Sequence, residues 1–365
     1  MTIFRLRAMR EDRGRFATLR NERVFMYWPH GLGDWVHLAA ILPLFDPSNA
    51  YAIARFGDDY SSVLEGNAHV RVLPSGARAL GDGSAQGAKH LGLVLGRLDG
   101  RPQDLDVPEP LAHALADFQP SVALWTDYPE TEGRTAFPFH TKARNLARLL
   151  VSRQRLESFD LSRPLPTTLD TAIAPALQGA IDERLRNFAP PGTKRYVLSR
   201  AGFTAERKNW DVAEARAFVR MVQRENPQAR IVAMEDPAFG DDSAWPGREI
   251  VAGYRELFHD VDAPFAKALF ALLARADGLV GIPAGPLHVA MACGGFPIVG
   301  LWLAHLPEWY DEPNPDAVHL IGSAVRERGF DRRPATTTLP EHWHRKRILD
   351  SRTIPADVVV EALAL

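Results

Sequence analysis

The chain has 365 residues, of which 46% are hydrophobic, and this is enough for two domains that each bury a core. A formal net charge of -2 gives no overall attraction to nucleic acid or to anionic membrane, so a basic contact surface would have to be local. We expect a cytoplasmic protein, because no apolar run approaches the ~18 residues of a membrane span and the first residues lack a secretory pattern.

The first 23 residues form a basic segment, in which seven arginines outnumber three acidic residues. Apolar side chains are interleaved with the arginines, which indicates a weakly amphipathic arm. Two interpretations stay open. The arm is either a solvated helix or strand that packs on the first domain, or a docking surface for an acidic acceptor or a membrane face.

A glycine-rich loop follows the first apolar run, Val24–Trp28, which is of strand length. The loop contains His30, Gly31 and Gly33, and Asp34 comes directly after it. Apolar residues at helical spacing follow, so Asp34 is expected at a helix start, above the carboxyl end of the strand. It could be the N-cap, for which Asp is a preferred residue, or a general base at the mouth of an interdomain cleft.

Strand and helix signals then alternate through the first half of the chain. The predicted strands are Tyr51–Arg55, Val70–Leu73, Leu91–Leu95 and Val122–Trp125, and the predicted short helices are Ser61–Glu65, Leu111–Phe118 and Asn145–Val151. Just before the last of these helices stand His140, Lys142 and Arg144, which either face an acceptor or belong to a solvated helix start.

A region rich in proline and threonine interrupts this alternation. We therefore expect an N-terminal domain at 1–165, a linker at 166–190 that includes a short helix near Leu177–Phe188, and a C-terminal domain at 191–365.

The second domain opens with the strand Tyr196–Ser199 and a basic loop that contains Gly202, Thr204 and Lys208. A loop of this kind after a strand can hold a diphosphate, although exposed loops are often basic without binding anything. Asp211 and Glu214 then have the spacing of a capping box for the helix that follows. The next predicted strand is Arg230–Met234. Glu235 follows at its carboxyl end and could accept from ribose hydroxyls or be an ordinary surface glutamate.

The stretch from Ala276 to Leu301 predicts a complete strand, loop, helix and strand. Gly278–Gly281 is a short apolar run, Pro286 suits the first turn of a helix, and two glycines at 294 and 295 end that helix. Unpaired backbone N–H groups and the positive end of the helix dipole make the loop a predicted site for an anionic ligand. Cys293, the single cysteine, excludes an internal disulfide and a cysteine-cluster metal site.

The remaining predicted elements are a helix at Phe265–Ala274, a strand at Ala317–Ile321 and a closing helix at Ala356–Leu363. The chain contains no Walker loop, HExxH, GxSxG or EF-hand pattern, which argues against P-loop, zincin, α/β-hydrolase and calcium-binding proteins.

Three short motifs in this order resemble the bacterial ADP-heptose glycosyltransferases of family 9. They are Gly31-Leu32-Gly33-Asp34, Lys208-Asn209-Trp210, and Ala276-Asp277 followed by Gly281 and by Gly285-Pro286-Leu287-His288-Val289-Ala290. The resemblance extends from about Val24 to the last helix. It implies a GT-B fold, in which two Rossmann-like domains face each other across a cleft, with the acceptor on the N-terminal domain and the nucleotide sugar on the C-terminal one.

The resemblance also assigns roles to individual residues. It implies that Asp34 is the catalytic base, that Lys208 contacts the diphosphate and Glu235 the ribose, and that the start of the helix from Gly285 to His288 faces the phosphates. It further implies an inverting transfer of a sugar, heptose from ADP-heptose in the family, to a hydroxyl acceptor without metal or cofactor. The acceptor could be a saccharide, a protein or a small metabolite.

One departure from the family pattern lies in the loop before this helix. Pro283 and Ala284 stand where family members usually have Asp and Ser or Thr. The donor sugar is therefore left open, and two alternatives remain. One is a catalytically silent module that binds a nucleotide sugar, and the other is a GT-B epimerase or hydrolase that acts on the nucleotide sugar itself.

Overall fold

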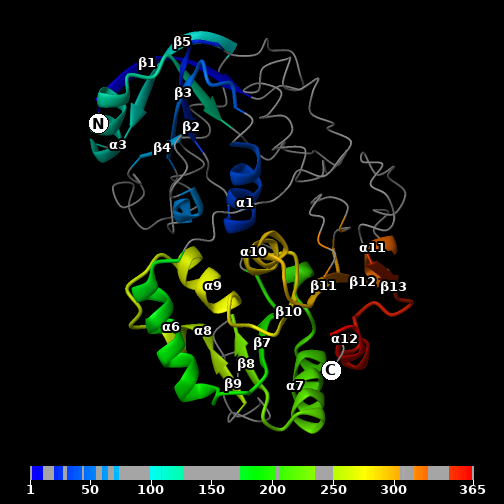
Figure 1. The fold of residues 1–365 in the computed structure, drawn as a ribbon. Helices are drawn as coiled ribbons and strands as arrows, with labels where there is room; N and C mark the ends of the chain where they lie inside the picture. The colour runs from blue at the N-terminus through cyan, green and yellow to red at the C-terminus, as the bar shows by residue number, and fades with distance from the viewer. Residues whose placement is uncertain are drawn as a thin grey trace. The chain divides into compact units, whose positions relative to one another are not determined.

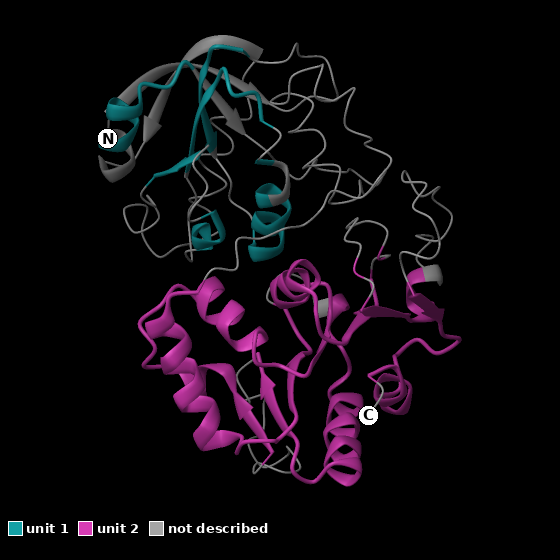
Figure 2. Cartoon of the chain, viewed as in Figure 1, with its two compact units in different colours: residues 1–161 teal, residues 162–365 magenta. Residues whose placement is uncertain are grey.

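The chain divides into two compact units, residues 1–161 and 162–365 (Figure 2). The computed structural model describes residues 2–10, 20–27, 31–42, 45–54, 60–64, 70–73, 99–107, 109–125, 173–202, 206–234, 250–304, 307, 314, 316–327 and 345–363. Each unit contains its own sheet and is described by itself.

The first unit is built on a six-stranded sheet in the order β4-β3-β2-β6-β1-β5 (Figure 1). The strands are β1 Thr2–Arg10, β2 Arg23–Tyr27, β3 Ala50–Ala54, β4 Val70–Val72, β5 Asp99–Val107 and β6 Val122–Trp125. All neighbours are parallel except β1 and β5. The helical elements are α1 Leu32–Ile41, η2 Ser61–Leu64 and α3 Glu109–Phe118. The predicted strand Leu91–Leu95, the predicted helix Asn145–Val151 and the residues 11–19 lie outside the described residues.

The basic segment at the start of the chain contributes a strand to this sheet. β1 lies between β6 and β5, so the expected arm is part of the first unit from residue 2 to residue 10. This is the packed-strand interpretation of the arm. β5 was not predicted, because Asp99–Val107 contains a proline and four charged residues and has no apolar run. An edge strand tolerates both, since its outer backbone groups need no partner in the sheet.

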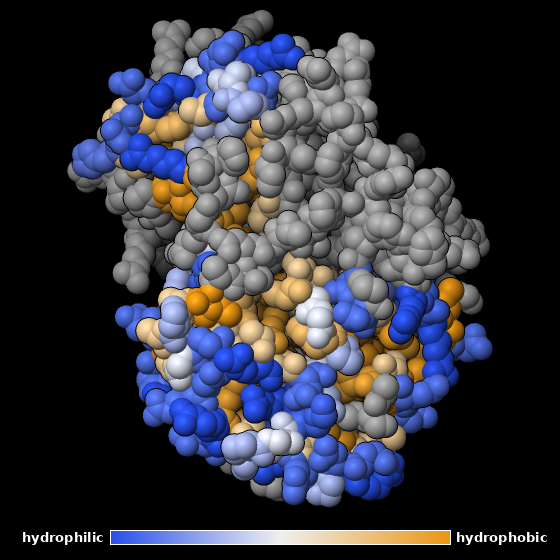
Figure 3. Space-filling view, in the orientation of Figure 1, coloured by the Kyte–Doolittle hydropathy of each residue, from blue (hydrophilic) through white to orange (hydrophobic). Residues whose placement is uncertain are grey.

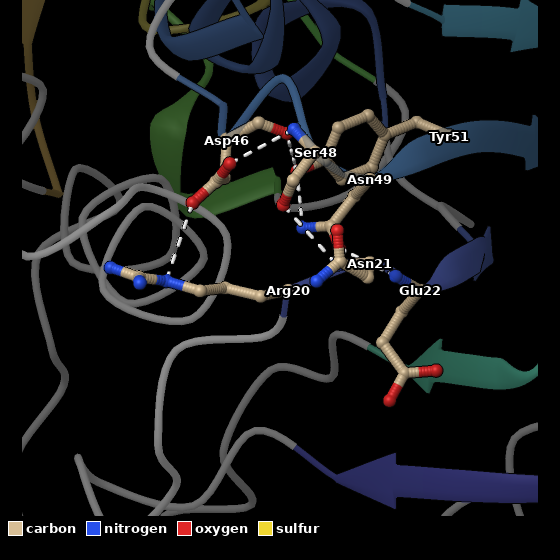
Figure 4. Close-up of polar contacts among 7 residues, drawn as sticks. All are labelled: Arg20, Asn21, Glu22, Asp46, Ser48, Asn49 and Tyr51. Atoms are coloured by element: carbon tan, nitrogen blue, oxygen red, sulfur yellow. Dashed lines mark hydrogen bonds and ion pairs between the residues drawn. The ribbon is translucent and has the colours of Figure 1, made fainter.

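A polar network ties the turn between α1 and β3 to the chain entering β2 (Figure 4). Asn49 Oδ1 accepts the Glu22 N–H at 2.9 Å, and the Asn49 amide donates to the Tyr51 hydroxyl at 2.9 Å. The Tyr51 hydroxyl donates to the Asp46 carbonyl at 3.0 Å, and the Ser48 N–H donates to the Asp46 carboxylate at 2.9 Å. Since Asn49 and Asp46 are buried, these bonds remove the cost of placing polar groups there. They fix how β2 and β3 enter the sheet.

The second unit is built on a seven-stranded, fully parallel sheet in the order β13-β12-β11-β10-β7-β8-β9 (Figure 1). Its strands are β7 Arg195–Ser199, β8 Arg230–Ala233, β9 Val251–Gly253, β10 Gly278–Gly281, β11 Ile298–Trp302, β12 Ala317–Ile321 and β13 Arg345–Ile348. Its helices are α6 Pro175–Phe188, α7 Val212–Glu225, α8 Tyr254–Phe258, α9 Phe265–Leu273, α10 Gly285–Cys293, α11 Ser323–Glu327 and α12 Ala356–Ala362, with a short 3-10 turn, η4, at Glu206–Lys208.

The core of the second unit follows from the apolar periodicity of its helices. On α7 the residues Ala215, Phe218, Val219 and Val222 recur at helical spacing and are fully buried. The polar residues of the same helix lie on its other face. Over α6 and α7, the face of the molecule in Figure 3 is accordingly mainly hydrophilic. Among the helices that the structure describes, none combines the length and the apolar character needed to cross a bilayer.

Helix α6 falls within the range 166–190 that the composition assigned to a linker. Its residues belong to the second unit, and two ion pairs hold it there. The Asp182 carboxylate accepts from the Arg275 guanidinium at 2.7 Å and 3.0 Å, and Arg184 pairs with Asp260. The part of the range from 175 to 188 is therefore an element of this unit rather than a connecting segment.

The first prediction concerns the ion pair between Asp182 and Arg275. Hydrogen bonding from Arg275 lowers the pKa of Asp182. Because the folded-state pKa lies below the unfolded value, the pair stabilises the unit above the unfolded pKa of ~3.9 and loses this contribution as the pH falls through the folded pKa. We expect Asp182→Asn to lower the free energy of unfolding at pH 7 by up to about 1 kcal/mol, since the pair is partly exposed.

Chemical denaturation of both proteins at pH 7 and pH 2.5 measures this difference, which should shrink at the lower pH. Asp262→Asn, which removes an exposed carboxylate of the same unit, serves as the control. A difference that stays constant between the two pH values would contradict the prediction.

Candidate functional site

The order of strands reverses between β7 and β10 in the second unit. From β7 the chain adds β8 and β9 on one side, and from β10 it adds β11, β12 and β13 on the other. Ser199 pairs with Gly281, and the Ile282 N–H donates to the Ser199 carbonyl at 2.9 Å. The loops that follow β7 and β10 therefore leave the sheet side by side. Open α/β sheets bind their ligands at such a reversal, outside the carboxyl ends of the strands.

These two loops also approach each other beyond the strands. A Cβ atom placed on Gly202 would lie 3.6 Å from the Cβ of Ala284 and 3.7 Å from the Cδ1 of Ile282. The basic loop and the start of α10, which the sequence marked separately as phosphate sites, are thus neighbours in the folded unit.

The start of α10 offers fewer backbone donors than the sequence suggested. Its N-cap is Ala284, whose own N–H donates to Ile282 at 2.7 Å. The N–H groups of Leu287 and His288 both donate to the Ala284 carbonyl, and proline at 283 and 286 has no N–H. Between residues 283 and 288, the N–H of Gly285 is the one that has no acceptor among the described residues. The prediction of several unpaired N–H groups is therefore reduced to one.

The side chains of α10 divide between surface and core. Leu287 is fully buried, with its Cβ 3.6 Å from where a Cβ on Gly281 would lie, and His288 is 4% exposed. Gly285 and Pro286 are half-buried and are the surface part of the helix start. Burial raises the pKa of Cys293 to about 12, which keeps the thiol protonated and argues against a nucleophilic role. Positive φ angles of 62° and 82° at Gly294 and Gly295 end the helix as predicted.

The basic loop from Arg200 to Trp210 is closed by hydrogen bonds between its ends. The Trp210 N–H donates to the Arg200 carbonyl at 2.9 Å, and the Arg200 guanidinium donates to the Trp210 carbonyl at 2.9 Å. Closer to the middle, the Gly202 N–H donates to Asn209 Oδ1 at 3.0 Å. Lys208 is half-buried at the end of η4, just before Asn209. Sequence reasoning missed this closure, although Asn is typical of turns because its side chain bonds nearby backbone N–H groups.

Trp210 anchors the loop in the core of the second unit. It is fully buried, its indole donates to the Ile354 carbonyl at 2.8 Å, and its ring meets that of Phe218 edge-on at 6.0 Å. The indole hydrogen bond holds the end of the loop to the segment that enters α12. The position of Lys208 thus depends on core packing as well as on its own turn.

The capping box predicted for α7 forms only in part. Asp211 is the N-cap and accepts from the N–H groups of Ala213 and Glu214, as predicted. The Glu214 side chain does not return to Asp211 but accepts the N–H of Ala356 at 2.8 Å, at the start of α12. Asp211 and Glu214 therefore have the spacing of a capping box, but Glu214 caps α12 instead of α7.

In the first unit the strand order reverses between β2 and β6, and the glycine loop with Asp34 follows β2. α1 begins earlier than predicted, with Gly31 as its N-cap, so the N-cap interpretation of Asp34 is wrong. Asp34 lies in the first turn, where its N–H donates to the Gly31 carbonyl at 3.0 Å, and it is 7% exposed. A carboxylate there is stabilised by the positive end of the helix dipole. Gly33 is half-buried and Gly31 is exposed.

The other predicted site residues lie outside the described residues, and their roles stay predictions. They are His30, His140, Lys142, Arg144, Thr204 and Glu235. Within the described part of the chain, no three His, Cys, Asp or Glu side chains are grouped so that they could hold a metal ion.

A comparison of the chain with protein-family models gives no match, and a comparison with curated proteins gives none either. Solved structures do match. A glycosyl transferase of family 9 from Veillonella parvula has a TM-score of 0.58 at 15% sequence identity, with 95% of this chain and 97% of that chain covered. The ADP-heptose LPS heptosyltransferase II of E. coli has a TM-score of 0.51 at 12% identity, with 94% and 97% covered. The chain therefore has the GT-B fold of these glycosyltransferases.

Proposed function

We propose that the chain is a glycosyltransferase that moves a sugar from a nucleoside diphosphate sugar to a hydroxyl acceptor, with ADP-heptose as the first donor to test. The heptosyltransferase among its structural neighbours supports this donor, as does the family 9 motif order in the sequence. The acceptor would bind the first unit and the donor the second. The facing of the two units across a cleft stays a prediction of the fold.

One observation carries the proposal. In each unit, the predicted site residues follow the strands at which the strand order reverses. Asp34 follows β2 in the first unit, and Lys208 and Gly285 follow β7 and β10 in the second. The first unit thus has a buried carboxylate in the first turn of a helix, and the second unit has a lysine in the loop whose Gly202 lies beside the start of α10. A transferase needs both, a base for the acceptor and a cation for the departing diphosphate.

The mechanism that follows is a single displacement. Asp34 takes the proton of the acceptor hydroxyl as that oxygen attacks the anomeric carbon, and the bond from this carbon to the diphosphate oxygen breaks, with inversion. Lys208, the N–H of Gly285 and the dipole of α10 stabilise the charge on the departing nucleoside diphosphate. We propose that no metal ion takes part, because these groups supply the positive charge that the step requires.

Binding of nucleoside diphosphate sugars tests the proposal directly. A ligand present at about 100 times its Kd stabilises the folded protein by ~2.7 kcal/mol, which a thermal-shift screen detects. We expect a shift with ADP-heptose or a related nucleotide sugar, and sugar transfer once a hydroxyl acceptor is added. No shift with any nucleotide sugar would contradict the proposal.

A silent nucleotide-sugar module is the competing function, and one observation favours it. The loop before α10 carries Pro283 and Ala284 in place of acidic and hydroxyl residues, and α10 offers a single N–H at its start. Binding without turnover in the presence of a range of acceptors would support the module. Turnover of the nucleotide sugar with water alone would instead support a hydrolase or epimerase.

Lys208→Ala is expected to raise the KM for the donor at least tenfold. A hydrogen bond to a charged group contributes ~1.5–3 kcal/mol, and the variant removes both the bond and the charge. Steady-state kinetics with varied donor concentration measure the change. Lys346→Ala, which removes an exposed lysine from β13, provides the control. An unchanged KM in Lys208→Ala would make the residue an ordinary surface lysine.

A further inference from the structure

We propose that Asn209 is the positioning residue of the donor site and that its side chain holds Lys208 in place for the donor diphosphate. This inference rests on the proposed function. Asn209 acts through Lys208, by way of the bond that its Oδ1 accepts from the Gly202 N–H at 3.0 Å.

The turn that carries Lys208 is short. η4 comprises three residues, and a 3-10 turn of this length has poor hydrogen-bond geometry and little stability of its own. The chain around it is held at Trp210, which is buried and bonded to Arg200 and Ile354. These bonds close the loop at its base.

The bond between Asn209 and Gly202 adds a contact on the η4 side of the loop. Asn209 is the next residue after Lys208, and Gly202 is the residue whose Cβ position lies 3.6 Å from Ala284, the N-cap of α10. One side chain therefore connects the turn of the lysine to the part of the loop beside the helix start. The two groups proposed to contact the diphosphate, Lys208 and the N–H of Gly285, are thereby kept in a fixed arrangement.

The amide suits this position better than a carboxylate. Asn supplies an acceptor oxygen for the Gly202 N–H without adding negative charge beside Lys208. Asp could accept the same hydrogen bond, but its charge would pair with the lysine and repel the donor diphosphate. The residue type thus fits a site for an anionic ligand, whereas a role limited to closing the loop would be met equally by either residue.

The test measures the affinity for nucleoside diphosphates by titration calorimetry, with ADP, UDP, GDP and CDP each tried on the wild type. We expect Asn209→Ala to weaken binding of the preferred nucleotide about threefold to tenfold, as the loss of one hydrogen bond allows. In the Lys208→Ala background the same substitution should change affinity by less than about twofold, because contacting residues that act together are not additive. Asn226→Ala is the matched control, since it removes an Asn that accepts the N–H of Gln228 at the end of α7. Its affinity should equal that of the wild type.

Asn209→Asp separates positioning from loop closure. It should bind less tightly than the wild type at 50 mM salt, and the ratio between the two should approach one at 500 mM salt, where charge interactions are screened. This variant keeps the acceptor, so it also serves if Asn209→Ala fails to fold.

Two results would overturn the inference and leave the proposed function standing. One is normal nucleotide affinity in Asn209→Ala together with weakened affinity in Lys208→Ala. The other is an equal effect of Asn209→Ala with and without Lys208, which would mean that the residue acts on the loop in general. If the wild type binds none of the four nucleotides, the proposed function fails and the inference fails with it.

Discussion

Asp34→Asn is expected to lower kcat by about 10²–10⁴-fold, because general-base catalysis typically contributes that much to the rate. Asn has nearly the same shape, so the buried site should stay packed, but it cannot take the proton of the acceptor hydroxyl. The KM for the donor should change little, since the proposed donor groups belong to the other unit. Initial rates with saturating donor and acceptor measure the effect.

The change in stability must be separated from the change in rate. Asp34 lies in the first turn of α1, and the loss of a carboxylate near a helix N-terminus costs about 0.3–1 kcal/mol. Asp357→Asn makes the same change in the first turn of α12 and serves as the control. If Asp34→Asn keeps a near-normal kcat, the base role is excluded and His30, four residues earlier, becomes the next candidate.

Trp210→Ala should reduce the free energy of unfolding of the second unit by about 3–5 kcal/mol, the usual cost of emptying a buried tryptophan site. Trp210 is fully buried against Phe218, and its indole bond to Ile354 is lost as well. Urea denaturation followed by circular dichroism measures the change.

Trp210→Phe divides this cost into two parts. It keeps most of the ring volume but leaves the Ile354 carbonyl without the indole donor, which is expected to cost about 1–3 kcal/mol. The alanine variant should therefore be the less stable of the two. A loss below about 1 kcal/mol in Trp210→Ala would show that the loop is not anchored in the core.

The segment from β10 to β11 could be predicted from sequence because its sequence signals are local. An apolar run, a proline in the first turn and two glycines at the helix end each act on their own residues, and the structure has β10 at the predicted bounds. The edge strands β5 and β13 were missed for the opposite reason. Asp99–Val107 and Arg345–Ile348 are rich in charge and acquire their structure from pairing with β1 and β12.

In the candidate site too, features that depend on contacts between distant residues could not be predicted from sequence. The glycine loop indicated a helix near Asp34, but the apolar period begins at Trp35 while α1 begins at Leu32, so the cap was placed too late. The spacing of Asp211 and Glu214 could not reveal that Glu214 caps a helix 142 residues further along the chain. Which N–H groups of the α10 start are already bonded also depends on folding geometry rather than on residue type.

The anchoring of the basic loop at α12 has a consequence for synthesis. The bonds from Trp210 to Ile354 and from Glu214 to Ala356 join residues 144 and 142 positions apart. A ribosome that adds ~5–20 residues per second reaches these partners roughly 7–30 s after it has made the loop. During that interval Trp210 has no indole acceptor at Ile354 and Glu214 has no helix to cap. The basic loop of the nascent second unit therefore gains these two contacts only once the segment that enters α12 has been made.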